Sequence, residues 1–327
     1  MKNLRKFTLA FLLIFTMSLS VVGCSAKKVE DTTTKPAATA TAKPAATEAP
    51  KTGAVVIEKA VNDYFANMPA DTYKIPEKDF VEKVKAGDKT MLAIDIRTAE
   101  DYAKGHIKGA VNIPWGTAIS DNLDKLPTDK TLLIYCYTGQ TAGQTVALLN
   151  MAGFTAKSVH LGWTLGISKV EGIAALTETT PTALTPSTTT KVNADVKAAI
   201  TKYYAGLADV NSTIYKFYKI SEDDLKKFVD AKDSSIYILS VRKAEDYAIG
   251  HIQGAVNIPF AAGMEKKFNT LPKDKKIVVY CYSGQTSGQV VAGLRLLGYD
   301  AVSLNSGMGI PGTVTAGWAN KGFPVVK

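Results

Sequence analysis

Short apolar runs alternate with amphipathic segments along most of the chain after residue 54. The runs are three to six residues long and rich in β-favouring side chains, which is typical of strands buried on both faces. We expect strands at 91–96, 111–113, 131–135 and 156–161, and helices at 55–67, 77–85, 98–104 and 142–151. This alternation predicts an α/β fold with a parallel sheet that is covered by helices on both faces.

The whole pattern then occurs a second time. Residues 105–107 (Gly-His-Ile) recur at 250–252, and residues 109–114 (Gly-Ala-Val-Asn-Ile-Pro) recur at 254–259, in each case 145 positions further on. A constant spacing over several motifs indicates a duplicated domain rather than chance similarity.

The N-terminal segment has the pattern of an export signal. Basic residues precede about 16 apolar positions at 7–22, fewer than the ~20 that a membrane-spanning helix needs, and the segment ends Val-Val-Gly before Cys24. It resembles a bacterial lipoprotein signal peptide in which Cys24 is lipidated; the alternatives are an ordinary secretory signal or an uncleaved anchor. We expect an extracytoplasmic protein anchored by lipid to the cell membrane, or to the outer membrane of a two-membraned cell.

Two stretches rich in Thr and Pro separate the remaining parts of the chain. They contain few of the apolar residues that would offset the entropy lost on folding, so the first is expected to be a disordered tether. The predicted organisation is a signal peptide at 1–23, a tether at 24–54, a first domain at 55–176, a linker at 177–194 and a second domain at 195–327.

Composition narrows the class of protein further. With 327 residues, 46% apolar content and three cysteines, the chain is long enough for two ordinary cores and is not a disulfide scaffold. The net charge is +9, but we find no cluster of Lys and Arg interleaved with aromatic residues, so we expect no nucleic-acid partner. We also expect no metal and no cofactor.

Cys136 and Cys281 are the candidate reactive groups. Each follows a predicted buried strand and precedes a predicted helix, a position that lowers the pKa of a thiol and places loop N–H groups around an anion. The alternatives are inert buried cysteines or one disulfide between them. The predicted site comprises catalytic Cys136 and Cys281, the substrate-binding loops Tyr137, Thr138, Gly139, Gln140, Thr141 and Tyr282, Ser283, Gly284, Gln285, Thr286, and Trp163 and Met308 as candidates for the roof of the pocket.

These motifs resemble the rhodanese-like sulfurtransferases. The family pattern is Asp-x-Arg, an acidic-aromatic pair, Gly-His-Ile-x-Gly-Ala-x-Asn-Ile-Pro, and a cysteine that heads a six-residue loop with glycine at its fourth position; both halves follow it closely, at 95–141 and 240–286. The resemblance implies a five-stranded parallel sheet with helices on both faces in each domain. It also implies transfer of sulfane sulfur, through cysteine persulfides, from a donor such as thiosulfate or a persulfide to a thiophilic acceptor.

The chain departs from the family pattern at the end of each loop. The last position is commonly arginine, and here it is Thr141 or Thr286. Loss of a guanidinium removes a charge that binds a dianion, so weaker binding of thiosulfate is expected. The same departure keeps open a non-catalytic alternative, in which the fold serves as a sulfur carrier, a sensor or a partner-binding lipoprotein.

Other polar residues of the motifs are expected to be structural. We expect His106 and His251 to be hydrogen-bonded within a turn, the alternative being a catalytic base. Arg97 and Arg242 are expected to pair with acidic residues three positions later, at 100 and 245. In the second half, Ser240 replaces the aspartate of the Asp-x-Arg motif, which weakens the expected support of Arg242.

Overall fold

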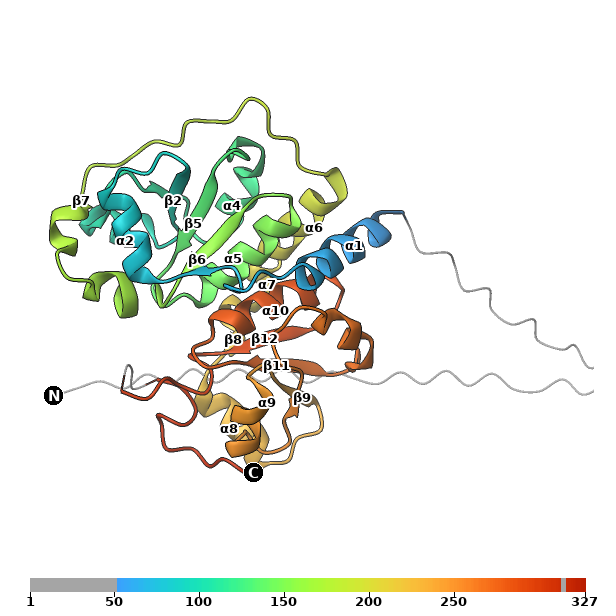
Figure 1. Cartoon of the computed structure of the whole chain (residues 1–327). Helices are drawn as coiled ribbons and strands as arrows, with labels where there is room; N and C mark the ends of the chain where they lie inside the picture. The colour runs from blue at the N-terminus through green and yellow to red at the C-terminus, as the bar shows by residue number, and fades with distance from the viewer. Residues whose placement is uncertain (1–51, 313–315) are drawn as a thin grey trace, which may run out of the picture. The chain divides into compact units, whose positions relative to one another are not determined.

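The computed structural model describes residues 52–312 and 316–327 (Figure 1). Cys24, the predicted signal peptide and nearly all of the predicted tether therefore lie outside the described residues. Within the described part, no helix combines the length and the apolar character that a membrane span requires.

Two five-stranded sheets, each wholly parallel, form the centre of the two halves. The first has the order β1-β6-β5-β2-β4, and the second has the equivalent order β8-β12-β11-β9-β10. The strands are β1 Lys74–Ile75, β2 Met91–Asp95, β4 Val111–Asn112, β5 Thr131–Tyr135, β6 Ala156–Val159, β8 Lys219–Ile220, β9 Ile236–Ser240, β10 Val256–Asn257, β11 Lys276–Tyr280 and β12 Ala301–Leu304. The predicted α/β fold with two five-stranded parallel sheets is confirmed.

Helices cover both faces of each sheet. The α-helices are α1 Thr52–Ala66, α2 Glu77–Lys85, α3 Ala99–Lys104, α4 Thr117–Asp121, α5 Gln140–Met151, α6 Ala194–Ala205, α7 Leu207–Val210, α8 Glu222–Asp230, α9 Ala244–Ile249 and α10 Gln285–Leu296. Shorter helical turns are η1 Leu123–Lys125, η2 Gly162–Gly166, η3 Ile167–Lys169, η4 Ile173–Leu176, η5 Lys216–Tyr218 and η6 Met264–Thr270. The predicted helix at 77–85 and strand at 131–135 have the observed bounds, and the other predicted elements agree within three residues.

The Thr/Pro-rich segment after residue 176 lies along the first half. Its start, β7 Thr177–Glu178, pairs antiparallel with β3 His106–Ile107. Further on, the Thr182 N–H donates to the Tyr102 hydroxyl (3.0 Å), and the Thr190 hydroxyl donates to a backbone carbonyl of the first half (2.7 Å). The segment is thus hydrogen-bonded along its length, while the domain boundaries that we placed around it stay predictions.

The first helix of each half packs against the other half. Phe65 of α1 contacts the ring of Phe268 in the second half edge-on, with 5.1 Å between ring centroids. Tyr204 of α6 makes the corresponding contact with Trp115 of the first half, also at 5.1 Å. Figure 1 shows α1 beside α10 and α6 beside α4 and α5. Because α1 and α6 each pack on the other half, the apolar residues between the two sheets form one continuous core.

The helices that follow the two cysteine loops, α5 and α10, touch through their backbones. A Cβ atom on Gly143 would lie 2.2 Å from the carbonyl oxygen of Gln285, and a Cβ on Gly288 would lie 2.5 Å from that of Gln140. Only glycine fits at either position, because these distances are far below van der Waals contact. The close crossing brings the two cysteine loops next to each other at the junction of the halves.

Candidate active site

Both thiols lie at the C-terminal end of the central strand of their sheet. Cys136 follows β5 and Cys281 follows β11, and their residues are 2% and 1% exposed. Both are free, which contradicts the alternative in which they form a disulfide. In a parallel sheet, this edge of the strands is where ligands bind.

The loop backbone turns toward each sulfur atom. The N–H of Gly139 donates to Cys136 Sγ, and the N–H of Gly284 donates to Cys281 Sγ, both at 3.1 Å. These glycines have φ angles of +88° and +89°, a left-handed conformation that side chains disfavour. In this conformation each glycine directs its N–H group toward the sulfur atom.

Trp163 and Met308 are the two candidates for the roof of the pocket. Trp163 and Met308 do contact the site, but through their backbone N–H groups, which donate to the carbonyls of the two cysteines at 2.7 and 2.8 Å. The Trp163 ring packs against the guanidinium of Arg97 at 4.3 Å, and the Met308 side chain is buried in the core. The cavity beside Cys281 is lined instead by the next three residues, 309–311.

The tyrosines at the second loop position anchor the loop. Tyr137 donates its hydroxyl hydrogen bond to Asp101 (2.6 Å), and Tyr282 donates to Asp246. Hydrogen bonds from Lys104 and Tyr137 lower the pKa of Asp101 to about 2, so this carboxylate is charged at neutral pH. The acidic-aromatic motif and the cysteine loop are therefore tied together in both halves.

The loop glutamines reach across to the other half. Gln140 Nε2 donates to the hydroxyl of Ser303 in the second half, and Gln285 Nε2 donates to the hydroxyl of Ser158 in the first, both at 2.7 Å. Both side chains are buried. They hold the junction of the halves, so these residues can offer a substrate only their backbone groups.

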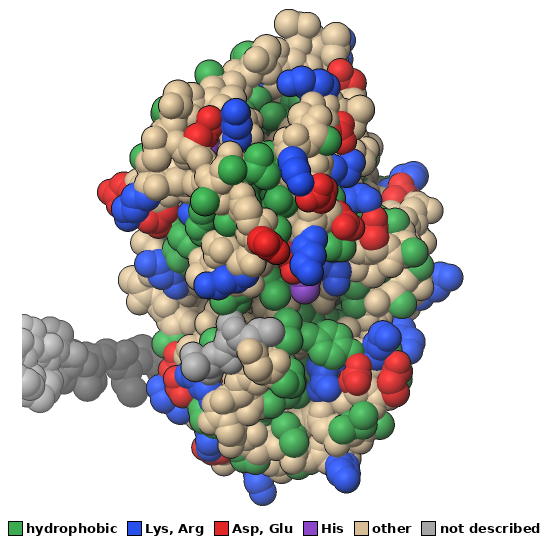
Figure 2. Space-filling view, turned by 60° about the vertical axis from the view of Figure 1, so that its left-hand side comes forward, with side chains coloured by type: hydrophobic (Ala, Val, Ile, Leu, Met, Phe, Trp, Pro, Cys, Tyr) green, Lys and Arg blue, Asp and Glu red, His purple; other side chains and the backbone are tan. Residues whose placement is uncertain are grey.

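A cavity of about 330 Å³ opens beside Cys281, and both halves line it. The second half contributes the thiol, loop residues and a wall that includes Gly309 and Pro311, while the first half contributes Lys74 and His160. Figure 2 shows Lys and Arg side chains interspersed with Asp and Glu on one face of the molecule.

Our sequence analysis missed Lys74 and His160. Lys74 lies on β1, which has only two residues and is too short to show a strand pattern. The repeat could have indicated Lys74, because a second lysine, Lys219, lies 145 positions after it. Lys219 is on the equally short β8.

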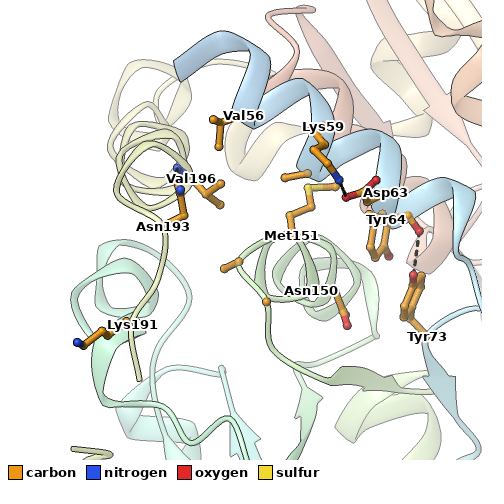
Figure 3. Close-up of a pocket in the computed structure, with 13 residues that line it drawn as sticks. Val56, Lys59, Asp63, Tyr64, Tyr73, Asn150, Met151, Lys191, Asn193 and Val196 are labelled. Atoms are coloured by element: carbon orange, nitrogen blue, oxygen red, sulfur yellow. Dashed lines mark hydrogen bonds and ion pairs between the residues drawn. The ribbon is translucent and has the colours of Figure 1, made fainter. Parts of the chain in front are cut away.

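A second hollow lies away from the thiols, between α1, the end of α5 and the start of α6, with a volume of about 580 Å³ (Figure 3). Some of its polar groups pair with one another: Lys59 pairs with Asp63 at 2.5 Å, and the Tyr73 hydroxyl donates to the Tyr64 carbonyl at 2.8 Å. It contains no residue of either cysteine loop. We assign it no chemistry.

The surroundings of the Cys281 sulfur favour its thiolate. Burial raises the pKa of this thiol, but hydrogen bonds from the hydroxyls of Thr286 and Ser287 and from the backbone of Ser283 and Ser287 outweigh burial and lower the pKa below its ordinary value. The Ser287 hydroxyl lies 3.5 Å from Sγ and 2.8 Å from the Ser303 hydroxyl. In the first half, an alanine, Ala142, occupies the position of Ser287.

We expect Ser287→Ala to slow the alkylation of Cys281 at neutral pH by about tenfold, since hydrogen bonds to charged groups contribute ~1.5–3 kcal/mol. Removing a donor to the thiolate raises the pKa of the thiol, so the curve of alkylation rate against pH should move to higher pH. Mass spectrometry of the two cysteine peptides after timed iodoacetamide treatment measures both thiols in one sample. Ala142→Ser is the matched variant and should speed alkylation of Cys136; an unchanged Cys281 rate in Ser287→Ala would contradict the assignment.

The two motif arginines are structural, as expected, but their partners differ from the prediction. Arg97 pairs with Asp95 at 2.7 Å and donates to a backbone carbonyl, rather than to the acidic residue at 100. Arg242 donates to two backbone carbonyls at 2.8 Å and not to the residue at 245, and its buried Nε has no partner among the described residues. Ser240 is too short to reach it as the carboxylate of Asp95 reaches Arg97, which confirms the weaker support.

The two motif histidines are also structural. His106 is fully buried, and its ring nitrogens face the carbonyl oxygens of Tyr102 (2.8 Å) and Thr180 (3.2 Å). His251 Nδ1 faces the Tyr247 carbonyl at 3.0 Å. Each ring stacks on the tyrosine that holds it, so the structural prediction is confirmed.

Comparison with known proteins establishes the family. The rhodanese-like domain matches residues 78–165 and 221–309, together more than half of the chain, and each match contains one of the cysteine loops. The chain therefore belongs to the rhodanese-like family and carries two such domains.

The chain is similar to several sulfurtransferases by name and to solved structures. A sulfurtransferase of Allochromatium vinosum is 30% identical over 106 residues, covering 32% of this chain and 91% of that protein. YtwF of Bacillus subtilis is 37% identical over 90 residues, covering 28% of this chain and 85% of that protein. A rhodanese-related protein from Thermoplasma volcanium shares 30% identity, with a TM-score of 0.28, over 33% of this chain and 96% of that one.

Other relatives are matched over only part of their length. The alignment covers 44% of YrkF of Bacillus subtilis and 12% of a TBC domain-containing protein kinase-like protein of Gallus gallus. The matched region therefore spans less than half the length of these two relatives. Within 52–312 and 316–327, no three His, Cys, Asp or Glu side chains cluster as a metal site would require.

Proposed function

We propose that this protein is a sulfurtransferase that carries sulfur as a persulfide on Cys136 and Cys281. The observation that supports the proposal most strongly is the pair of free thiols, each with a loop N–H at 3.1 Å from sulfur and a helix N-terminus behind it. Such a setting stabilises a sulfur anion, whether thiolate or persulfide. Membership of a family with sulfurtransferase relatives agrees with this chemistry.

The reaction divides into two displacements at sulfur. In the first, the cysteine thiolate attacks the outer sulfur of the donor; the donor's S–S bond breaks, and its electron pair leaves with the remainder, which is sulfite when the donor is thiosulfate. In the second, an acceptor such as cyanide or a thiolate attacks the outer sulfur of the persulfide, and the electron pair returns to Sγ. Loop N–H groups face Sγ, which carries the negative charge before the first step and again after the second.

A non-catalytic sulfur carrier is the second candidate. It is favoured by the loop itself, in which both sixth positions are threonine and no residue is basic, so the loop offers no charge to a small dianionic donor. A carrier would accept sulfur from a persulfide and hold it, but would not turn over small donors and acceptors.

Sulfur loading tests the proposal. The protein is incubated with thiosulfate or with polysulfide, freed of the donor, and weighed intact by mass spectrometry. We expect a gain of up to two sulfur atoms, removed by dithiothreitol, with the added sulfur on the two cysteine peptides. No gain with either donor would contradict both candidate functions, whereas loading without turnover would favour the carrier.

We further propose that the protein acts outside the cytoplasm, held to a bacterial membrane by lipid on Cys24. The support is the sequence of the N-terminal segment alone. Cys24→Ser should abolish labelling of the protein by a fatty-acid analogue in cells and release it from the membrane fraction. Equal labelling of the variant and the native chain would contradict the assignment.

A further inference from the structure

The two cysteine loops lack a cationic side chain, although the proposed chemistry involves anions at every stage. Residues 136–141 and 281–286 are uncharged apart from their thiols. Thiosulfate carries two negative charges, and the thiolate and persulfide carry one each. A site that brings such groups together needs a positive charge nearby, because like charges in a partly buried cavity repel strongly.

A lysine of the opposite half lies at the thiol. Lys74 of the first half lines the cavity that contains Cys281 of the second. It is half-buried, and among the described residues its ammonium forms no ion pair with a carboxylate. Burial lowers the pKa of Lys74, and the negative charges of Cys281 and Asp71 partly offset this effect.

The topology of the sheet explains this placement. Lys74 on β1 is the register partner of Ser158 on β6, so the two residues are neighbours across adjacent strands. Ser158 in turn accepts the hydrogen bond from Gln285, which lies four positions after Cys281. The cysteine loop of the second half is therefore docked on the strand edge that carries Lys74.

The equivalent arrangement places a lysine of the second half, Lys219, at the cysteine loop of the first half. Lys219 on β8 is the register partner of Ser303 on β12, and Ser303 accepts the hydrogen bond from Gln140 in the loop of Cys136. Burial lowers the pKa of Lys219, and the charges of Cys136 and Glu222 partly offset it. Lys219 also forms no ion pair among the described residues.

We propose that each active site is completed by a lysine from the other domain, Lys74 at Cys281 and Lys219 at Cys136, and that these two ammonium groups bind the anionic sulfur donor and stabilise the sulfur anion. The inference rests on the proposed function for the identity of the anion. It makes the pair of domains the functional unit, because either domain alone would lack the charge at its thiol. The lysines thus supply the positive charge that the loop arginine supplies in the family pattern.

The two sites differ in the side chains that the opposite half contributes. At Cys281 the first half also contributes His160, whose Nδ1 lies 3.3 Å from the carboxylate of Glu77. The equivalent position in the second half is an asparagine, Asn305. The Cys281 cavity therefore contains an imidazole, paired with a carboxylate, that has no counterpart at position 305.

The test is a crossover between lysines and thiols in the full chain. Lys74→Gln should slow alkylation of Cys281 about tenfold at neutral pH and leave Cys136 unchanged, while Lys219→Gln should slow Cys136 and leave Cys281 unchanged. Lys74→Met keeps the packing of the methylene stem and should behave as Lys74→Gln does. Lys74→Arg keeps the charge and should retain the native rate, and Lys78→Gln, at an exposed lysine on α2, controls for net charge.

The outcomes separate this inference from the proposed function. Alkylation needs no sulfur transfer, so the crossover can be read even if the protein loads no sulfur, and that failure would count against the proposed function alone. If sulfur loads but each lysine variant alters both thiols equally, or neither thiol, the inference is overturned. On a Cys136→Ser background, Lys74→Gln should also raise the KM for thiosulfate more than it lowers kcat for release of sulfite.

Discussion

The double variant Cys136→Ser, Cys281→Ser is expected to lose thiocyanate formation from thiosulfate and cyanide by a thousandfold or more, down to the background. Serine has nearly the shape of cysteine, but its hydroxyl is not ionised at neutral pH and cannot form a persulfide. Both thiols are buried within tight loops, so the isosteric change should leave the fold intact. Circular dichroism and the urea midpoint of unfolding check that the fold is retained.

The single variants assign the activity to each site. Cys281→Ser should remove the larger share, because Cys281 receives a hydrogen bond from Ser287 that Ala142 cannot supply to Cys136. Cys136→Ser should retain most of the turnover. Full activity in the double variant would show that the thiols are not the sulfur carriers, and equal losses in the single variants would contradict the inequality of the sites.

Gly143→Ala has the largest expected effect on stability. Its new Cβ would lie 2.2 Å from the backbone carbonyl of Gln285, and this oxygen is not the mobile end of a side chain. We expect a loss of about 3 kcal/mol in the free energy of unfolding, the upper end for overpacking, because α5 and α10 must move apart. The urea midpoint measures the loss.

The control for this prediction is another glycine-to-alanine change in a helix. At Gly53 of α1, the nearest atom to a new Cβ is a carboxylate oxygen of Asp195 at 3.1 Å, which can rotate away. Gly53→Ala should change the free energy of unfolding by less than about 0.5 kcal/mol. An unchanged midpoint in Gly143→Ala would contradict the close crossing of the two helices.

The elements with strong local patterns could be predicted from sequence. The buried runs at 131–135 and 276–280 became the central strands because continuous apolar, β-branched residues fit a sheet covered on both faces. Because these strands could be predicted, the position of Cys136 and Cys281 at the strand ends could be predicted as well. The two-residue strands β1 and β8 could not be recognised, since two residues show no periodicity, and the lysines on them were missed with them.

Contacts between the halves could not be predicted from local sequence patterns. Gln140 and Gln285 were assigned to the substrate loops because they lie within them, but their side chains are bound to serines of the opposite half. Likewise, nothing in the sequence near Gly143 indicates that another helix backbone lies against it. The repeat shows that there are two domains of one kind, but their docking depends on shape complementarity over residues far apart in the chain.

The central claim is that a cysteine persulfide is the intermediate that passes sulfur on. The most direct test loads the protein with sulfur, removes all donor, adds cyanide once, and follows both the intact mass and the thiocyanate released. We predict that the added sulfur disappears from the protein as an equal amount of thiocyanate appears, with no donor present. A persulfide that forms on the cysteines but stays inert to cyanide and to thiol acceptors would contradict a sulfurtransferase.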